Sequence, residues 1–296
     1  MKSVVLPNGL SVQAFNRLEP QVLYHEIFAT EAYAKHGIVV HPGDCVFDVG
    51  ANLGLFSIYL AQHYPDLTIY SIEPVPAMFE LLRHNAARHV APAATSHLLN
   101  IGLSNASRTA TFAYNRILSM TAGMYSKELE AGVDRQATAY AWVQAMVADA
   151  ARAGQLNARA ARGLNRLLAT PGLRLPVLVL LSVPLLLLLG YLKRSTRQVA
   201  CQLRTLSEVL HEQQVARVDL VKIDVEGGEW DVLRGVHDDD WPRLRQLVIE
   251  VHDLHNRVAD MTGFLQTRGY EVIVDQEDWS LHRLMRIHTL YARRVD

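Results

Sequence analysis

The sequence is poor in cysteine and has almost no net charge. Cys45 and Cys201 lie more than a hundred residues apart and lack the spacing of metal ligands, so we expect two free thiols in a reducing compartment. Basic and acidic residues nearly balance, 29 against 30, and a net charge of −1 gives no long-range attraction for nucleic acid. The absence of a Gly-x-Ser-x-Gly elbow, a P-loop and a Cys-x-x-Cys pair excludes the catalysis that these motifs support.

We expect no secretory signal at the amino terminus. The apolar stretch before Pro7-Asn8-Gly9 is too short for one, and these three residues favour a hairpin turn between short strands. Residues 24–36 have the apolar spacing of a helix, which would lie across the mouth of a ligand site. We therefore expect a cytoplasmic protein with a small amino-terminal cover.

Short apolar strands alternate with amphipathic helices on both sides of a central interruption. This alternation predicts an α/β fold with a doubly wound, Rossmann-like, mostly parallel sheet. The last two strands are too close for an intervening helix, so we expect an antiparallel hairpin at the carboxyl-terminal edge of the sheet. The expected strands are Cys45–Val49, Thr68–Ile72, His97–Ile101, a β-rich stretch near Thr109–Ala113, Asp219–Ile223, Gln246–Val251, Tyr270–Val274 and Ile287–Ala292; the expected helices are Asn52–His63, Pro76–His89, Gly228–Gly235 and one that ends near Arg268.

The middle of the chain departs from this alternation. Residues 127–170 are rich in alanine and arginine and favour helix, and an uncharged apolar run follows from Leu175 to Leu192. The run is long enough for one transmembrane helix. A single crossing would leave the two halves of the sheet on opposite sides of a membrane, and two crossings need about 40 apolar residues. We therefore do not expect the chain to span a membrane.

Three interpretations of this insertion remain open. They are a helix buried against the sheet or a second subunit in a homodimer, a shallow hairpin in one membrane leaflet, and an apolar lid over a lipid-like acceptor. Basic residues flank the apolar run on both sides, as peripheral contact of residues 173–194 with an anionic membrane would favour: Arg174, Lys193, Arg194 and Arg197. We divide the chain into an amino-terminal cover (1–44), a core (45–115 and 200–296) and a helical, apolar insertion (116–199).

The most informative motif joins the first core strand to the next helix. Asp48 ends the strand, and Gly50 and Gly54 let the backbone of the turn approach a ligand. A dinucleotide-binding turn reads Gly-x-Gly-x-x-Gly, but Asn52 replaces the second glycine, which disfavours the alternative of a nicotinamide-dependent reductase. S-adenosylmethionine has no pyrophosphate and carries cationic sulfonium and ammonium groups, which suit a carboxylate at Asp48.

Two later strand ends add to this site. Glu73 ends the second strand, where an acidic side chain accepts the ribose hydroxyls of a bound nucleoside. Asn100 and Gly102 lie at the end of the third strand and are placed to contact adenine. The expected ligands of S-adenosylmethionine are therefore Asp48, Gly50, Asn52, Gly54, Glu73, Asn100 and Gly102.

Together these segments resemble the FkbM family of methyltransferases. The resemblance covers roughly residues 20–115 and 200–293, and the matching motifs are Asp48 to Gly54, Glu73-Pro74, Lys222 to Glu229 and Val248 to Asp253. It implies a class I methyltransferase fold and S-adenosylmethionine as the methyl donor. It also implies O-methylation, in particular of compounds from polyketide and nonribosomal-peptide pathways.

Methyl transfer to an aliphatic hydroxyl is an in-line displacement that needs a base for the departing proton. Asp224 and His252 end adjacent strands at the edge where ligands bind in such sheets. We expect His252 to be the base, because its pKa normally lies nearest neutral pH. Asp224 could orient His252, accept the proton itself or bind an acceptor hydroxyl, and Glu226 is the third expected catalytic residue. Further acidic residues at this edge leave a hard divalent cation as an alternative, although we assign no metal ligands: Glu229, Glu250 and Asp253.

The sequence thus predicts an S-adenosylmethionine-dependent O-methyltransferase. Its acceptor is expected to be a hydroxyl of a small natural product or of a glycan or lipid, and no nucleic-acid partner is expected. The alternative from another functional class is a membrane-associated interaction protein that retains the fold without catalysis.

Overall fold

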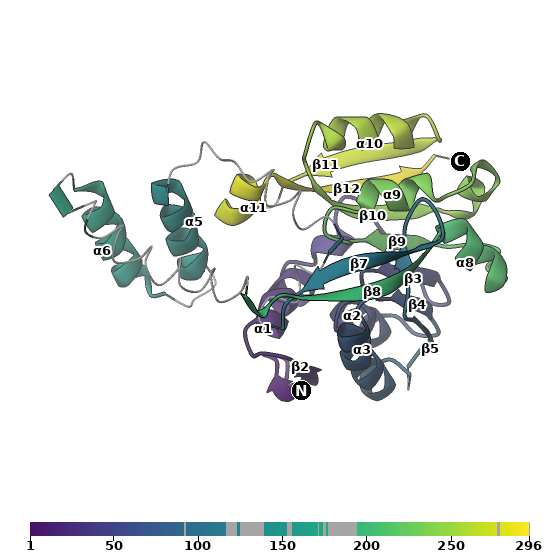
Figure 1. Cartoon of the computed structure of the whole chain (residues 1–296), viewed down its shortest axis with the longest axis horizontal. Coiled ribbons are helices and arrows are strands. Elements are labelled where there is room, and N and C mark those ends of the chain that lie inside the picture. Colours follow the sequence, from purple (N-terminus) through teal and green to yellow (C-terminus); the bar gives the residue numbers. More distant parts are fainter. Residues whose placement is uncertain are drawn as a thin grey trace.

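The computed structural model describes residues 1–91, 93–116, 123–124, 139–152, 156–170, 172–173, 176, 194–276 and 279–295. The core is a twisted sheet with helices on both faces, and two helices of the insertion extend from one side of it (Figure 1). The apolar run from Leu175 to Leu192 lies, apart from Pro176, outside the described residues. Within the part of the chain that is described, no helix is long and apolar enough to cross a membrane.

The central sheet has seven strands in the order β11-β12-β10-β9-β3-β4-β5. The five strands from β10 to β5 are mutually parallel, and β12 is antiparallel to both of its neighbours. This order confirms the predicted doubly wound, class I arrangement. The strands are β3 (Cys45–Val49), β4 (Thr68–Ile72), β5 (Thr95–Leu99), β9 (Leu220–Ile223), β10 (Gln246–His252), β11 (Tyr270–Asp275) and β12 (Ile287–Arg294).

The predicted carboxyl-terminal hairpin is present, with two differences. A short helix, α11 (Ser280–Met285), lies between β11 and β12, where the sequence left no room for one. The strand β12 lies between β10 and β11, so only β11 forms the edge of the sheet.

Both faces of the sheet are covered because its strands are apolar at consecutive positions. Val46 packs with the helices of one face and the adjacent Phe47 packs with those of the other, as the alternation of side chains along a strand requires. The first face carries α2 (Leu55–His63) and α3 (Pro76–His89); the second carries α8 (Leu206–Glu212), α9 (Glu229–Arg234) and α10 (Arg257–Gln266).

The amino-terminal segment packs on the first face. The predicted hairpin is confirmed as β1 (Lys2–Val5) paired with β2 (Ser11–Ala14). The expected helix over residues 24–36 is instead α1 (Glu19–Tyr24), a π-helical turn (His25–Ala29) and a 3₁₀ turn (Ala32–Ala34). This broken helix brings Tyr33 beneath the strand ends, where its hydroxyl meets the candidate site.

A second, three-stranded sheet lies beside the carboxyl ends of the main strands. It consists of β6 (Gly102–Leu103), β8 (Arg197–Arg204) and β7 (Arg108–Tyr114), in that order. The β-rich stretch expected near Thr109–Ala113 is therefore confirmed, whereas the sequence reading missed β8. Antiparallel pairing of β7 with β8 places Tyr114 opposite Arg197, so the chain leaves the core and returns to it at neighbouring points.

The described part of the insertion is helical, as its composition predicts. It contains α5 (Ala139–Arg152) and α6 (Ala158–Ala169), and the side chain of Asn157 accepts a hydrogen bond from the amide of Ala160 (2.8 Å) at the start of α6. The two helices share a small buried cluster with Val143, Val147, Ala161 and Leu168. The amide of Ser280 in α11 donates to the carboxylate of Asp149 in α5 (2.9 Å), which ties the insertion to the core.

Candidate functional site

The turn after β3 forms the floor of the candidate site. Three of its residues have positive φ angles: Gly50 (78°), Asn52 (53°) and Gly54 (89°). A Cβ atom on Gly50 would lie 1.8 Å from the carbonyl oxygen of Asp224, so only glycine allows β3 and β9 to approach this closely. The amides of Gly50 and Ala51 donate to the carbonyl oxygen of Ile72, which fixes the turn against the end of β4.

Asp48 lies beneath this turn and not at its surface. Its side chain is fully buried, and its carboxylate accepts a hydrogen bond from the hydroxyl of Ser57 (2.7 Å). The ammonium group of Lys222 lies 3.4 Å from the other carboxylate oxygen. The expected direct contact of Asp48 with the cationic part of a cofactor therefore needs correction, because the buried carboxylate already has a cation beside it.

Lys222 is a site residue that the sequence did not point to. Its ammonium donates to the carbonyl oxygen of Gly50 (3.0 Å) and lies 3.3 Å from the carboxylate of Asp224. Burial opposes its charge, but the carboxylates of Asp224 and Asp48 outweigh burial and raise the pKa of Lys222 above its usual value. The available signal was a lysine at the centre of an otherwise apolar strand, because such a buried charge needs partners.

Substituting Lys222 by methionine should destabilise the fold, because it leaves Asp48 buried without a cation. Removing one partner of a buried ion pair costs about 3–5 kcal/mol in the free energy of unfolding. Urea unfolding of Lys222→Met measures this loss, and Asp48→Asn in the same chain should restore part of it. A loss as small as about 0.5 kcal/mol, which is typical of an exposed pair, would contradict the assigned role of Lys222.

Glu73 is held at the rim of the turn by two backbone amides. Its carboxylate accepts hydrogen bonds from the amides of Asn52 (3.1 Å) and Val75 (2.8 Å) and is 6% exposed. Burial raises the pKa of Glu73 to about 7, although the two amides oppose the shift. The carboxylate thus couples the two turns that follow β3 and β4.

Asn100 and Gly102 lie beside this carboxylate. The side-chain amide of Asn100 donates to the carbonyl oxygens of Glu73 (2.8 Å) and Pro74 (3.1 Å), so it shapes the turn after β4. Gly102 lines a cavity, where an added Cβ atom would come within 2.6 Å of the Leu203 side chain. Of these two predicted residues, only Gly102 lines the cavity, and Asn100 supports its wall.

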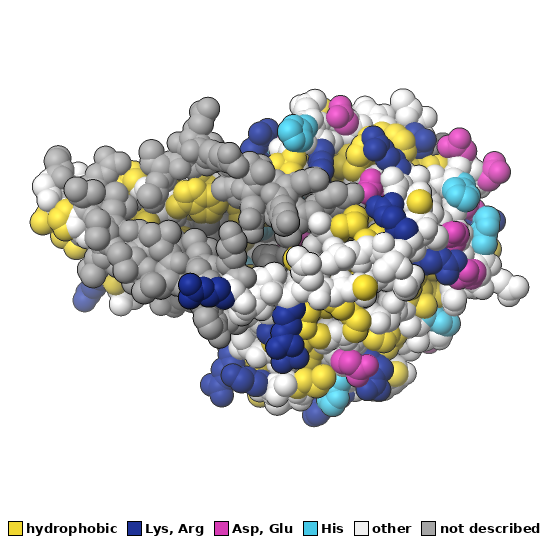
Figure 2. Space-filling view, viewed as in Figure 1, with side chains coloured by type: hydrophobic (Ala, Val, Ile, Leu, Met, Phe, Trp, Pro, Cys, Tyr) yellow, Lys and Arg dark blue, Asp and Glu magenta, His cyan; other side chains and the backbone are white. Residues whose placement is uncertain are grey.

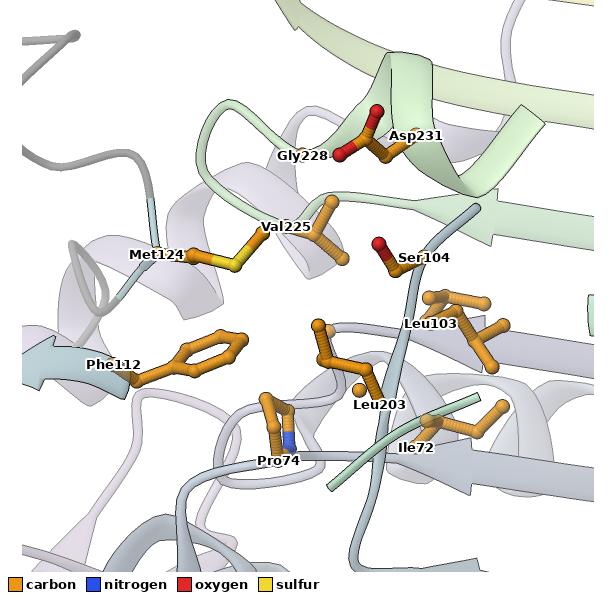
Figure 3. Close-up of a pocket in the computed structure, with 13 residues that line it drawn as sticks. Ile72, Pro74, Leu103, Ser104, Phe112, Met124, Leu203, Val225, Gly228 and Asp231 are labelled. Carbon is orange, nitrogen blue, oxygen red and sulfur yellow. The ribbon is translucent and has the colours of Figure 1, made fainter. Parts of the chain in front are cut away.

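This cavity lies at the carboxyl ends of β3, β4 and β9, against the second sheet, and is partly open to solvent. Figure 3 shows the side chains of Pro74, Phe112 and Leu203 around the opening, with Asp231 at its rim. Apolar walls with a single carboxylate are suited to a heteroaromatic ring that carries an amino group. The sequence reading did not identify Phe112, Leu203 or Asp231, because they come from strands and a helix brought together only by the fold.

The expected catalytic residues meet at the adjoining strand ends. Nε2 of the buried His252 lies 3.2 Å from a carboxylate oxygen of Glu226, and this side chain is 17% exposed. Glu226 has a φ of 54°, which is uncommon for a residue other than glycine and marks a turn under constraint. Asp224, also at the end of β9, is 23% exposed, and its carboxylate lies 3.4 Å from the hydroxyl of Tyr33, which donates to the carboxylate of Glu26 (2.7 Å).

The charges around His252 favour its protonated form. Burial opposes the charge, but Glu226, with smaller contributions from Glu229 and Asp224, raises the pKa of His252 above its ordinary 6.5. Burial also raises the pKa of Glu226, against the effect of His252. His252 and Glu226 therefore form a buried pair that holds a proton close to the strand ends.

The remaining acidic residues do not form a metal centre in the part of the chain that is described. Glu229 begins α9, its carboxylate accepts from the amide of Gly227 (2.6 Å), and burial raises its pKa to about 7. Asp253 pairs with Arg286 (2.6 Å). No group of three or more His, Cys, Asp or Glu side chains among the described residues is arranged to hold a metal ion.

The chain is similar to known methyltransferases. The sequence profile described as the methyltransferase FkbM domain matches residues 170–272. Over 295 residues the chain is 34% identical to the 31-O-demethyl-FK506 methyltransferase FkbM of Streptomyces tacrolimicus, an alignment that covers 100% of this chain and 98% of that protein. It is also 27% identical to Methyltransferase 1 of Beauveria bassiana, with 99% of this chain and 98% of that protein covered.

A solved structure gives a further comparison. The crystal structure of a methyltransferase FkbM from Methylobacillus flagellatus aligns with a TM-score of 0.47 and 12% identity, covering 88% of this chain and 46% of that one. The alignment with the Streptomyces protein includes the insertion, which the resemblance seen in the sequence had left uncovered.

Proposed function

Because the chain belongs to the FkbM family of methyltransferases, we propose that it transfers a methyl group from S-adenosylmethionine to a hydroxyl oxygen of a small natural product or lipid-like acceptor. The observation that carries this proposal is the position of the His252–Glu226 pair, on strand ends adjoining the glycine turn and the cavity. The name of the Streptomyces relative supports oxygen as the accepting atom.

The residues of the cavity fit the adenosyl part of S-adenosylmethionine. The apolar walls formed by Pro74, Phe112 and Leu203 suit the adenine ring, and Asp231 offers an acceptor for its amino group. The Gly50–Gly54 turn and Glu73 would hold the rest of the nucleoside. When bound, S-adenosylmethionine supplies a methyl group on a cationic sulfur, and the neutral thioether that remains after transfer is a good leaving group.

The protein's own contribution is position and proton removal. Lys222 holds Asp224 at the end of β9, where its partly exposed carboxylate can accept a hydrogen bond from the acceptor hydroxyl. In its unprotonated form, His252 would take the hydroxyl proton as oxygen forms its new bond to carbon, and Glu226 would stabilise the resulting imidazolium. With S-adenosylmethionine held by the glycine turn and the cavity, transfer of its methyl group to the acceptor oxygen would give an ether and S-adenosylhomocysteine.

Incubation with methyl-labelled S-adenosylmethionine and a panel of hydroxylated compounds tests the proposal. The panel pairs each free hydroxyl compound with its O-methylated counterpart, and we expect label only in the former, together with S-adenosylhomocysteine. Label attached to nitrogen or carbon would contradict the assignment of oxygen. Calorimetric binding of NAD in place of S-adenosylmethionine would instead support a reductase.

The Glu226→Gln substitution should move the acid limb of the pH profile of kcat/KM to lower pH. A base must be unprotonated, so the rate rises as pH climbs through the pKa of His252, which Glu226 holds above 6.5. Removing the carboxylate of Glu226 lowers the pKa of His252, so kcat/KM of the variant reaches its plateau at a lower pH. The matched substitution Glu271→Gln, at an exposed carboxylate paired with Arg293, should leave the profile unchanged. An unmoved acid limb in Glu226→Gln would contradict the pairing.

The same pair also affects stability. Since the folded-state pKa of His252 is raised, the stabilising contribution of the pair is fully present below the unfolded value of about 6.5 and is lost as pH rises through the folded value.

A further inference from the structure

Arginine side chains gather where the insertion leaves and rejoins the core. Arg116 lies where the chain leaves the core after β7, and Arg194 and Arg197 lie where it returns as β8. Arg17 belongs to the amino-terminal segment. The side-chain amide of Asn16 donates to the carbonyl oxygen of Arg116 (3.3 Å), and the side-chain amide of Asn115 donates to the hydroxyl of Ser195 (2.7 Å). These contacts bring the three segments together, and we name the four arginines the insertion-base patch.

The insertion-base patch gathers exposed positive charge at one place on the surface. Its four side chains are exposed, and none of them forms an ion pair with a carboxylate among the described residues. Arginines elsewhere on the surface do have acidic partners, such as Arg217 with Asp219 and Arg293 with Glu271. Figure 2 shows dark-blue side chains on the lower left of the core, around the ends of β7 and β8.

The helix α6 extends the positive charge along the insertion. Arg159, Arg162 and Arg166 are exposed, without ionic partners among the described residues, and share one side of the helix. The opposite side carries Ala161 and Leu168, which pack against α5. Between residues 150 and 207 the sequence has nine basic residues and no Asp or Glu, although the whole chain has a net charge of −1.

Unpaired guanidinium groups favour phosphate, which they bind through two parallel hydrogen bonds. The apolar side chains of this region indicate whether a lipid bilayer or a nucleic acid is the better phosphate-bearing partner. Leu18 and Val22, next to Arg17, are 52% and 39% exposed, and Leu167 of α6 is 43% exposed. A lipid bilayer offers both phosphate and an apolar phase for such side chains, whereas a nucleic acid offers a charged backbone.

We infer that the insertion-base patch, together with the arginine side of α6, binds the surface of an anionic membrane. The binding is peripheral: arginines contact lipid phosphates, and leucine and valine side chains enter the boundary between headgroups and acyl chains. The inference does not rest on the proposed function, because it concerns a different face and different residues.

Flotation of the whole protein with vesicles tests this inference. The parent should float with vesicles of phosphatidylcholine mixed with phosphatidylglycerol, and much less with phosphatidylcholine alone. High salt should weaken the binding, because the Debye length falls from about 10 Å at 0.1 M to about 3 Å at 1 M. Binding that is equal for both vesicle types, or absent from both, would overturn the inference.

A set of charge variants locates the binding surface. Replacing Arg17, Arg116, Arg194 and Arg197 by glutamine should weaken vesicle binding by about 100-fold or more, since each basic residue contributes roughly fivefold. A matched variant replaces four exposed arginines elsewhere on the surface, Arg83, Arg88, Arg217 and Arg234, and should bind as the parent does. An equal loss of vesicle binding in both variants would show that only the net charge of the protein matters, which would overturn the assigned patch. Cofactor binding and thermal melting, unchanged in both, show that the fold is intact.

The contribution of apolar side chains to binding distinguishes a membrane from a soluble polyanion. The double variant Leu18→Ser and Leu167→Ser should bind anionic vesicles about tenfold more weakly while its retention on heparin stays that of the parent. A parent that binds RNA or an acidic protein but neither type of vesicle would contradict the inference.

Discussion

Gly50→Ala should abolish the binding of S-adenosylmethionine while the protein still folds. The new Cβ atom would lie 1.8 Å from the carbonyl oxygen of Asp224, and backbone atoms cannot give way as a flexible side chain can. The turn must therefore move away from β9, and it carries the contacts that we assign to the cofactor. A displacement that costs about 3 kcal/mol of binding energy weakens affinity about 100-fold or more, which calorimetry measures directly.

Gly43→Ala is the matched control for this substitution. Gly43 has a φ of 84°, close to the 78° of Gly50, but no atom lies within 4 Å of the Cβ position. The control thus shares the left-handed backbone strain of about 1–2 kcal/mol and lacks the collision with β9. We expect it to lose some stability and to keep its affinity. Parental affinity in Gly50→Ala would exclude the turn from the cofactor site.

His252→Ala should lose most of its turnover and keep its cofactor. Removing a general base typically slows the chemical step about 10²–10⁴-fold. The cofactor contacts that we propose lie on the turn after β3 and in the cavity, and His252 lines neither. Single-turnover rates with labelled S-adenosylmethionine should therefore fall, while the calorimetric affinity stays within a few-fold of that of the parent.

The control for His252→Ala is His84→Ala, which removes an exposed imidazole from α3. It should leave the single-turnover rate and the affinity for S-adenosylmethionine unchanged. Retained turnover in His252→Ala would remove this residue from the mechanism. Joint loss of turnover and cofactor affinity would instead assign it a structural role at the end of β10.

The sequence was most informative where one physical requirement dominated. A strand buried on both faces must be apolar at consecutive positions, so β3 and β4 were located to the residue. The strand β8 was missed because only Cys201 and Leu203 are buried in it, and its polar residues favour a loop. The amino-terminal helix was misplaced because its apolar spacing continues through a π-helical turn that no local pattern marks.

Predicting the site required knowledge of side-chain direction. The motif placed Asp48 at a ligand-binding edge, which is correct for its backbone, but its carboxylate turns inward to Ser57 and Lys222. The sequence does not encode that direction locally, because it depends on the lysine of a strand more than 170 residues away. His252 and Glu226 were brought together as expected, since both follow adjacent parallel strands.

The most direct test of the central claim is a crystal structure of the protein with S-adenosylhomocysteine. We predict that the adenine ring occupies the cavity bounded by Pro74, Phe112 and Leu203 and that the sulfur faces the strand ends of Asp224 and His252. An empty cavity in protein saturated with the ligand, or a sulfur directed away from these strand ends, would contradict the account.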